Sequence, residues 1–152
     1  MIHRREALKR SAAAASLLAA SGLFPQHAQA WTPGAFNGKT VQEAIKAFGA
    51  SAAPVGSKDV VITGPDIAEN GAVVPLGVST SLTGIKQLLI LVEKNPSPLV
   101  AMFNVSDAVE ANFMTRAKMG QSSDVYAVAI TNDGRALFSK KEVKVTLGGC
   151  GG

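Results

Sequence analysis

Apolar and polar residues alternate along most of the chain after residue 58, and this alternation predicts β-strands. The clearest example is residues 143–147, VKVTL, where an apolar side chain occupies every second position. Turn-forming residues separate the apolar runs at intervals of roughly 8 to 15 residues. The predicted strands are 59–63, 72–79, 85–92, 99–105, 111–119, 124–131 and 136–147.

About seven short strands at such spacings predict an all-β fold, an immunoglobulin-like antiparallel β-sandwich. Pro75 lies inside the second run and indicates an edge strand or a bulge, because proline has no N–H to donate to a neighbouring strand. The triplet Asn132-Asp133-Gly134 indicates a hairpin turn before the last strand. Residues 107–119 also allow a helix capped by Asp107, so the strand there is the favoured of two interpretations.

A short N-terminal helix is predicted ahead of the strands. Thr40, followed three residues later by Glu43, is a capping box, and apolar residues then recur at helical spacing. Gly49 is a natural stop, so the helix is expected at 41–48. Residues 31–39 are rich in Gly, Pro and Asn and predict an irregular arm.

The first 30 residues have the organisation of an export signal. Arg4 and Arg5 precede a weakly apolar stretch at 11–24, which is too short for a good membrane span, and residues 28–30 show a small-x-small cleavage pattern. Paired arginines before a mild apolar region are typical of twin-arginine (Tat) export, although an ordinary secretory signal can also contain them. We expect cleavage after Ala30 and a mature protein in the periplasm, without a membrane anchor.

The charge of the chain is concentrated in this leader. The net charge is +4, but the first 30 residues contain four basic residues and only Glu6 as an acid, which leaves 11 basic and 10 acidic residues in the rest. No basic cluster occurs there, so nucleic-acid binding is not expected. Both histidines, His3 and His27, also lie in the leader. A Ser-His or Cys-His nucleophile pair cannot then form within the mature chain, and neither a metal site nor a cofactor is expected.

The chemistry of the chain is concentrated at its end, Gly148-Gly149-Cys150-Gly151-Gly152. A structural free cysteine is usually buried, and glycine neighbours cannot bury this single cysteine. Glycines and chain ends are conformationally free, so the thiol is expected to be exposed and to reach about 10 Å beyond Leu147. Such a thin arm suits delivery of one thiol into narrow pockets of several partners. The alternatives are a functionless tail and a disulfide-linked homodimer through Cys150.

These features divide the chain into four parts. We predict a cleaved Tat signal peptide at 1–30, an N-terminal arm and helix at 31–57 that ends in a linker at 50–57, a β-sandwich carrier domain at 58–147 and a flexible swinging arm at 148–152.

The last strand and tail, VKVTLGGCGG at 143–152, resemble the end of the SoxY family, the sulfur carrier of the periplasmic thiosulfate-oxidising Sox system. PDIAENG at 65–71, the Val-Pro pair at 74–75 and EKNPSPLVA at 93–101 are also similar to that family. The resemblance covers essentially the whole mature chain. It implies an immunoglobulin-like fold and a carrier that holds thiosulfate-derived intermediates covalently on Cys150 and catalyses no step itself.

The resemblance also implies partners. One is SoxZ, a second small β protein that forms a tight heterodimer. The others dock transiently: a haem cytochrome pair that couples thiosulfate to the thiol, a manganese hydrolase that releases sulfate and, in some organisms, a molybdenum-haem sulfane dehydrogenase.

Three other functions stay open at this point. The closing Gly151-Gly152 resembles ubiquitin-like sulfur carriers, which load a terminal thiocarboxylate, but that route needs an ATP-dependent adenylation that an exported protein would not meet. A thiol enzyme would need a fixed electropositive pocket around Cys150. A plain interaction module, dimerised through Cys150, would use the tail only as a link.

Overall fold

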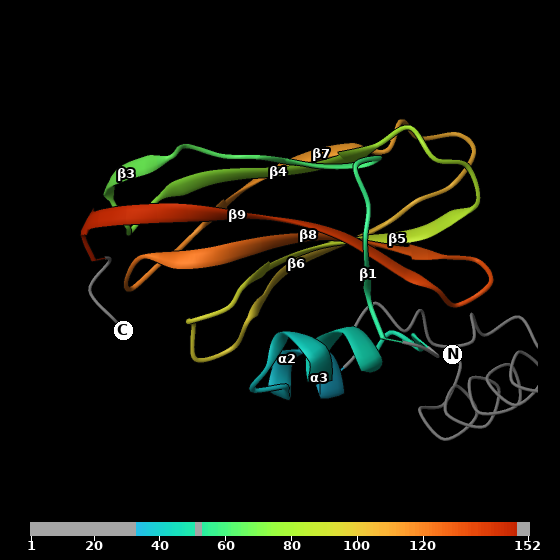
Figure 1. Cartoon of the computed structure of the whole chain (residues 1–152), viewed down its shortest axis with the longest axis horizontal. Helices are drawn as coiled ribbons and strands as arrows, with labels where there is room; N and C mark the ends of the chain where they lie inside the picture. Colours follow the sequence, from blue (N-terminus) through green and yellow to red (C-terminus); the bar gives the residue numbers. More distant parts are fainter. Residues whose placement is uncertain (1–32, 51–52, 149–152) are drawn as a thin grey trace, which may run out of the picture. The chain divides into compact units, whose positions relative to one another are not determined.

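The computed structural model describes residues 33–50 and 53–148. The chain divides into two units, Met1–Trp31 and Thr32–Gly152, and all described residues belong to the second unit. In this part of the chain two helices precede nine strands (Figure 1). The elements are α2 (Pro33–Asn37), α3 (Val41–Lys46), β1 (Val55–Gly56), β2 (Val60–Thr63), β3 (Ile67–Asn70), β4 (Val74–Thr80), β5 (Ile85–Val92), β6 (Leu99–Asn104), β7 (Asn112–Ala117), β8 (Ser123–Thr131) and β9 (Ala136–Leu147).

The strands form the two sheets of a sandwich. The larger sheet has the order β1-β9-β8-β5-β6, with β3 also paired to β9, and the smaller has the order β2-β4-β7. The core between them consists of small and aliphatic side chains from both sheets, among them Val60, Leu76, Val78, Leu88, Ile90, Val125, Ala127 and Val143. The predicted immunoglobulin-like β-sandwich is therefore confirmed.

The larger sheet is buried on both faces in its centre. In β8, Val125, Ala127 and Ala129 face the small sheet, whereas Val128 and Ile130 belong to a second apolar cluster on the other face. The two helices add Ala35, Ala44 and Ile45 to that cluster, so a helical layer covers the outer face of the larger sheet (Figure 1). Burial on both faces explains why β5 and β8 have almost uninterrupted aliphatic sequences.

The helix predicted at 41–48 is α3, which ends at Lys46 and is followed by a turn through Gly49 (φ 81°). The capping interactions are present: the N–H of Glu43 donates to Thr40 Oγ1 at 3.1 Å, and Glu43 Oε2 accepts from the N–H of Lys39 at 2.8 Å. The first bond pairs a donor that the first helical turn leaves free, and the second holds the residue before the N-cap against the helix.

The sequence predicts an irregular arm at 31–39, but this prediction is wrong for residues 33–37, which form α2. This helix is five residues long, and its Ala35 is fully buried against the larger sheet. A helix this short is not stable by local propensity, so packing on the sheet decides its conformation. The sequence contains no periodic signal over five residues from which this packing could be predicted.

The prediction of a purely antiparallel sandwich of about seven strands is also incomplete. Two further strands, β1 in the predicted linker and β3 in the PDIAENG segment, both run parallel to β9. They are two and four residues long. Such short strands depend on backbone hydrogen bonds to a strand about 80 residues away in sequence, and hydrophobic alternation does not reveal those bonds.

The seven predicted strands are confirmed, with ends within two residues of the prediction. The alternative helix at 107–119 is wrong, because β7 occupies its second half. Pro75 does not mark an edge strand, since β4 lies between β2 and β7. However, β2 pairs with β4 only as far as Gly77, so at Pro75 the strand has a single neighbour, β7, where Arg116 lies opposite.

A lysine ties β9 to the chain that crosses between the sheets. Lys141 Nζ donates to the backbone oxygen of Gly64 at 2.6 Å and lies 2.9 Å from Asp66 Oδ1. The hydrogen bond from Lys141, and then its positive charge, lower the pKa of Asp66. Lys141 therefore fastens the segment between β2 and β3 to the edge of the larger sheet.

We predict that Lys141→Met lowers the free energy of unfolding by about 1.5 kcal/mol, because the Gly64 carbonyl loses a charged donor. Urea unfolding would measure the change. The matched control is Lys140→Met, which removes an exposed ion pair with Asp124 (2.7 Å) on the same strand and should have a clearly smaller effect. Equal losses in the two variants would contradict this role of Lys141.

Candidate functional site

The last strand carries the chain from the core to the tail. Val143 is fully buried between the sheets, whereas Leu147, at the end of β9, is 70% exposed. β8 pairs with β9 from Ala136 to Val143, and on the other side β3 pairs with it up to Leu147. The strand is therefore held by a neighbour along its length until the residue before the glycine tail.

Three backbone segments meet where β9 ends. The N–H of Gly71 donates to the oxygen of Leu147 at 2.8 Å, and the N–H of Met119 donates to the oxygen of Gly71 at 2.7 Å. We call this junction of Gly71, residues 119–120 and residues 147–148 the arm base. Figure 1 shows β3 beside the end of β9 at this point.

Gly148 packs closely against the arm base. A Cβ at this position would overlap with the carbonyl oxygen of Gly120, so the close approach of the two backbones requires a glycine. Gly148 thus has a steric role in the body of the protein, in addition to any freedom that it gives the tail.

Polar side chains support the arm base from neighbouring loops. Asn95 Nδ2 donates to the oxygen of Lys118 at 2.8 Å, and Ser122 Oγ accepts from the N–H of Val145 at 2.9 Å. Asn70 Oδ1 accepts from the N–H of Ala72 at 2.8 Å and closes the turn after β3. Both asparagines of the family-like segments therefore have structural roles here.

Of the predicted site residues, the structure describes Gly148. Gly149, Cys150, Gly151 and Gly152 lie outside the described residues, as do Arg4 and Arg5 of the export signal.

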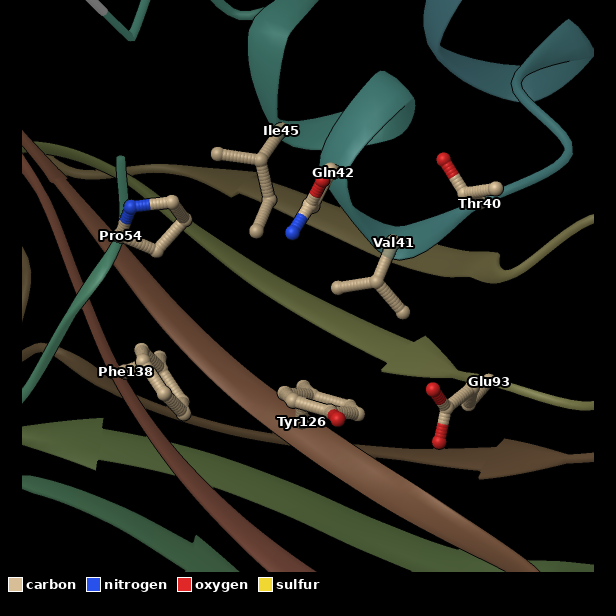
Figure 2. A pocket seen from close by; sticks show the side chains of 8 residues that line it. All are labelled: Thr40, Val41, Gln42, Ile45, Pro54, Glu93, Tyr126 and Phe138. Carbon is tan, nitrogen blue, oxygen red and sulfur yellow. The ribbon is translucent and has the colours of Figure 1, made fainter. Parts of the chain in front are cut away.

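A separate pocket of about 380 Å³ lies between α3 and the outer face of the larger sheet. Figure 2 shows side chains of α3 on one side and the rings of Tyr126 and Phe138 on the other, with Glu93 near the Tyr126 hydroxyl. The ring centroids are 5.8 Å apart. The lining residues are Thr40, Val41, Gln42, Ile45, Pro54, Glu93, Tyr126 and Phe138. The sequence gives no signal for this pocket, because it forms only when α3 packs on the sheet.

Burial and the charges of Glu93, Lys140 and Asp124 shift the pKa of the Tyr126 hydroxyl. Burial raises the pKa of the Tyr126 hydroxyl, and the negative charge of Glu93 raises it further. Lys140 opposes that rise; its Nζ lies 5.9 Å from the centre of the ring and 2.7 Å from Asp124 Oδ2.

The pocket is too distant to hold the thiol of the same chain. Tyr126 is level with Lys140 on β9, and Lys140 precedes Leu147 by seven residues, which is about 23 Å of strand. The cysteine is only three residues beyond Leu147, about 10 Å at full extension. The arm base and the pocket are therefore separate features.

Comparison with known proteins identifies the family. A family model described as "Sulfur oxidation protein SoxY" matches residues 44–150, so the match ends at the cysteine of the tail. The solved structure of the sulfur carrier protein SoxY from Chlorobium limicola f thiosulfatophilum is 33% identical, covers 71% of this chain and 97% of its own, and superposes with a TM-score of 0.64. The chain belongs to the SoxY family. It accordingly has a sulfur-carrier role in the Sox system.

More distant structures share the fold alone. A superoxide reductase (neelaredoxin) from Ignicoccus hospitalis is 16% identical, covers 57% of this chain and 79% of its own, and has a TM-score of 0.50. No curated protein matches the chain. Within residues 33–50 and 53–148 of this SoxY-family chain, no three His, Cys, Asp or Glu side chains are close enough together to hold a metal ion. None of the helices in the same residues is long and apolar enough to cross a bilayer.

The sequence predicted the tail but not the arm base of this SoxY-family chain. Gly71 and Gly120 are far from Gly148 in sequence, and only the pairing of β3 with β9 brings them together. The similarity of residues 65–71 to the family was the one signal for this region, and the structure gives it a reason, since these residues form β3 and the turn that holds the end of β9.

We predict that Gly148→Ala separates the end of β9 from Gly120 without unfolding the body. Hydrogen exchange at the N–H groups of Gly71 and Met119 should become about tenfold faster, equivalent to about 1.4 kcal/mol of local stability. The matched control is Gly120→Ala, because a Cβ there meets no atom within 4 Å. Unchanged exchange in Gly148→Ala would mean that the close approach does not hold the arm base.

Proposed function

We propose that this SoxY-family chain carries thiosulfate-derived sulfur covalently on the thiol of Cys150 and presents it to successive enzymes of the Sox system. The observation that carries the proposal is the position of the cysteine. It is the last residue of the family match, and it follows by three residues a strand that is paired up to Leu147. A fixed strand followed by glycines suits delivery of a thiol from a defined point.

The proposed chemistry begins with oxidative coupling. The thiol of Cys150 and thiosulfate, ⁻S–SO₃⁻, form a new S–S bond to give Cys150–S–S–SO₃⁻, and one proton and two electrons are released. The haem cytochrome pair takes the electrons. Water then attacks the terminal sulfur in the manganese hydrolase, and sulfate and two protons leave a persulfide anion on Cys150. Both products are S–S compounds of the kind that thiols form reversibly.

The division of labour follows from the composition of the chain. Apart from His3 and His27 of the predicted leader, the chain has no histidine that could act as a general base beside the thiol. Activation of Cys150 is therefore assigned to the pockets of the partner enzymes, and this chain contributes position and reach. In the same proposal the chain forms a heterodimer with a SoxZ-like β protein and docks transiently to the cytochrome pair, the hydrolase and a sulfane dehydrogenase.

The first test is the location of the cargo. Protein purified from cells growing on thiosulfate should carry mass additions that mild reduction removes, and all of them should map to the tail peptide. Cys150→Ser should remove them completely, which intact mass spectrometry would measure. Additions that persist on the serine variant would favour the rival route through the Gly152 carboxylate. A species of twice the mass that reduction splits, with no smaller addition, would favour a homodimer linked through Cys150.

The second test concerns export, which we propose to be twin-arginine-dependent and to end in the periplasm. Replacing both Arg4 and Arg5 with lysine keeps the charge but removes the paired guanidinium groups that the pathway recognises. The precursor of this variant should stay in the cytoplasm, with at least a tenfold drop in the periplasmic protein on immunoblots. Normal processing of the double-lysine variant would show that a general secretory route is used.

A further inference from the structure

We propose that the pocket between α3 and the outer face of the larger sheet is a binding site for a small aromatic ammonium ion. The ring of the ligand lies on Tyr126 and Phe138, and its ammonium group lies beside the carboxylate of Glu93. This site does not rest on the proposed carrier function, because the pocket lies beyond the reach of Cys150.

One end of the pocket is apolar. Figure 2 shows Pro54 and Phe138 at this end, and side chains of α3 across from Tyr126. The rings of Tyr126 and Phe138 are tilted by 40°, and their centroids are 5.8 Å apart. Both residues are half-buried, so each ring leaves part of its carbon surface for a ligand. An aromatic ligand buries apolar area on these rings and gains ring–ring contacts.

The other end of the pocket is polar. Figure 2 shows Thr40 and Glu93 at this end. Within residues 33–50 and 53–148, the acidic partners in the salt bridges are Asp66, Asp124 and Asp133. The carboxylate of Glu93 therefore lines the pocket without a salt bridge to any described residue.

The neighbouring groups leave this negative charge uncompensated. Lys140 also acts on Tyr126, but its Nζ lies 2.7 Å from Asp124 Oδ2, so these two charges neutralise each other. Burial and Glu93 raise the pKa of the Tyr126 hydroxyl, which therefore stays protonated at neutral pH and adds no charge. Charge complementarity then favours a cation in the pocket over an anion.

The backbone of Glu93 is fixed before a ligand binds. Its N–H donates to the oxygen of Asp124 at 3.0 Å, and the N–H of Lys94 donates to Ser123 Oγ at 3.0 Å. These bonds hold the end of β5 against the start of β8, the strand that carries Tyr126. The carboxylate and the ring thus belong to one rigid unit, which lowers the cost of ordering the site around a ligand.

The size of the pocket limits the ligand. Its volume of about 380 Å³ is near the lower end of the range of roughly 300–1,000 Å³ in which proteins bind small organic molecules. A single aromatic ring with a short aminoalkyl chain is a ligand of this class. Its ring meets the apolar end, and its ammonium group donates a charge-assisted hydrogen bond to Glu93 at the other end.

The test uses three compounds that share a ring and differ in charge. The purified chain is titrated by calorimetry with 2-phenylethylamine, a cation at pH 7, with the neutral 2-phenylethanol and with the anionic 3-phenylpropionate. We expect the amine to bind at least tenfold more tightly than the alcohol, and the anion to bind more weakly than both. Added salt should narrow the difference between amine and alcohol, because Glu93 is exposed to solvent.

Three variants separate the charge from the rings. Glu93→Gln keeps the shape of the side chain, so the affinity for the amine should fall to that for the alcohol. The matched control, Glu110→Gln, removes an exposed carboxylate that does not line the pocket, and both affinities should stay within twofold of wild type. Phe138→Leu removes a ring and should weaken the amine and the alcohol by the same factor, about fivefold.

Each outcome has a defined meaning. Equal affinities for the three compounds, no binding at millimolar concentration, or a preference for the amine that survives Glu93→Gln would overturn this site. An equal loss of preference in Glu110→Gln would also overturn it, because the general charge of the chain would then attract the amine. Mass addition to Cys150 is measured separately, so failure of the site leaves the proposed carrier function standing.

Discussion

The pairing of β9 with its neighbouring strands is the constraint on which the rest of the structure depends. Its twelve residues pair with β8 on one side and with the short parallel strands β1 and β3 on the other. Val143 contributes to the core between the sheets, and Lys141 fastens the crossing segment at Gly64. The same strand then leads into the glycine tail. The pairing of β9 therefore stabilises the sandwich and also fixes the point at which the tail with the thiol begins.

This arrangement suits a carrier better than an enzyme. The body fixes the start of the tail with backbone hydrogen bonds and with a glycine packed against a carbonyl group, and these interactions do not depend on the identity of the cargo. In the proposed cycle the sulfur species on the tail change, whereas the surface from which they are presented stays the same. That proposal assigns the specificity of each step to the enzymes that receive the tail.

The sequence was sufficient for the strands that have their own hydrophobic pattern, such as β5 and β8, whereas the chemistry of the tail stays a prediction. It was insufficient for α2, β1 and β3, which are too short to have a period and are stabilised by partners distant in sequence. For the same reason the arm base was not predicted: Gly71, Gly120 and Gly148 each look like an ordinary loop glycine until the pairing of β3 with β9 brings them together.

The position of β9 after all of its partner strands in the sequence has a consequence for biosynthesis. Because β1, β3 and β8 all pair with β9, these long-range contacts form only after β9 has been synthesised. A chain that terminates before β9 lacks both this strand and the cysteine that follows it. Such a product is expected to be unfolded, so that it does not become a folded body without a thiol.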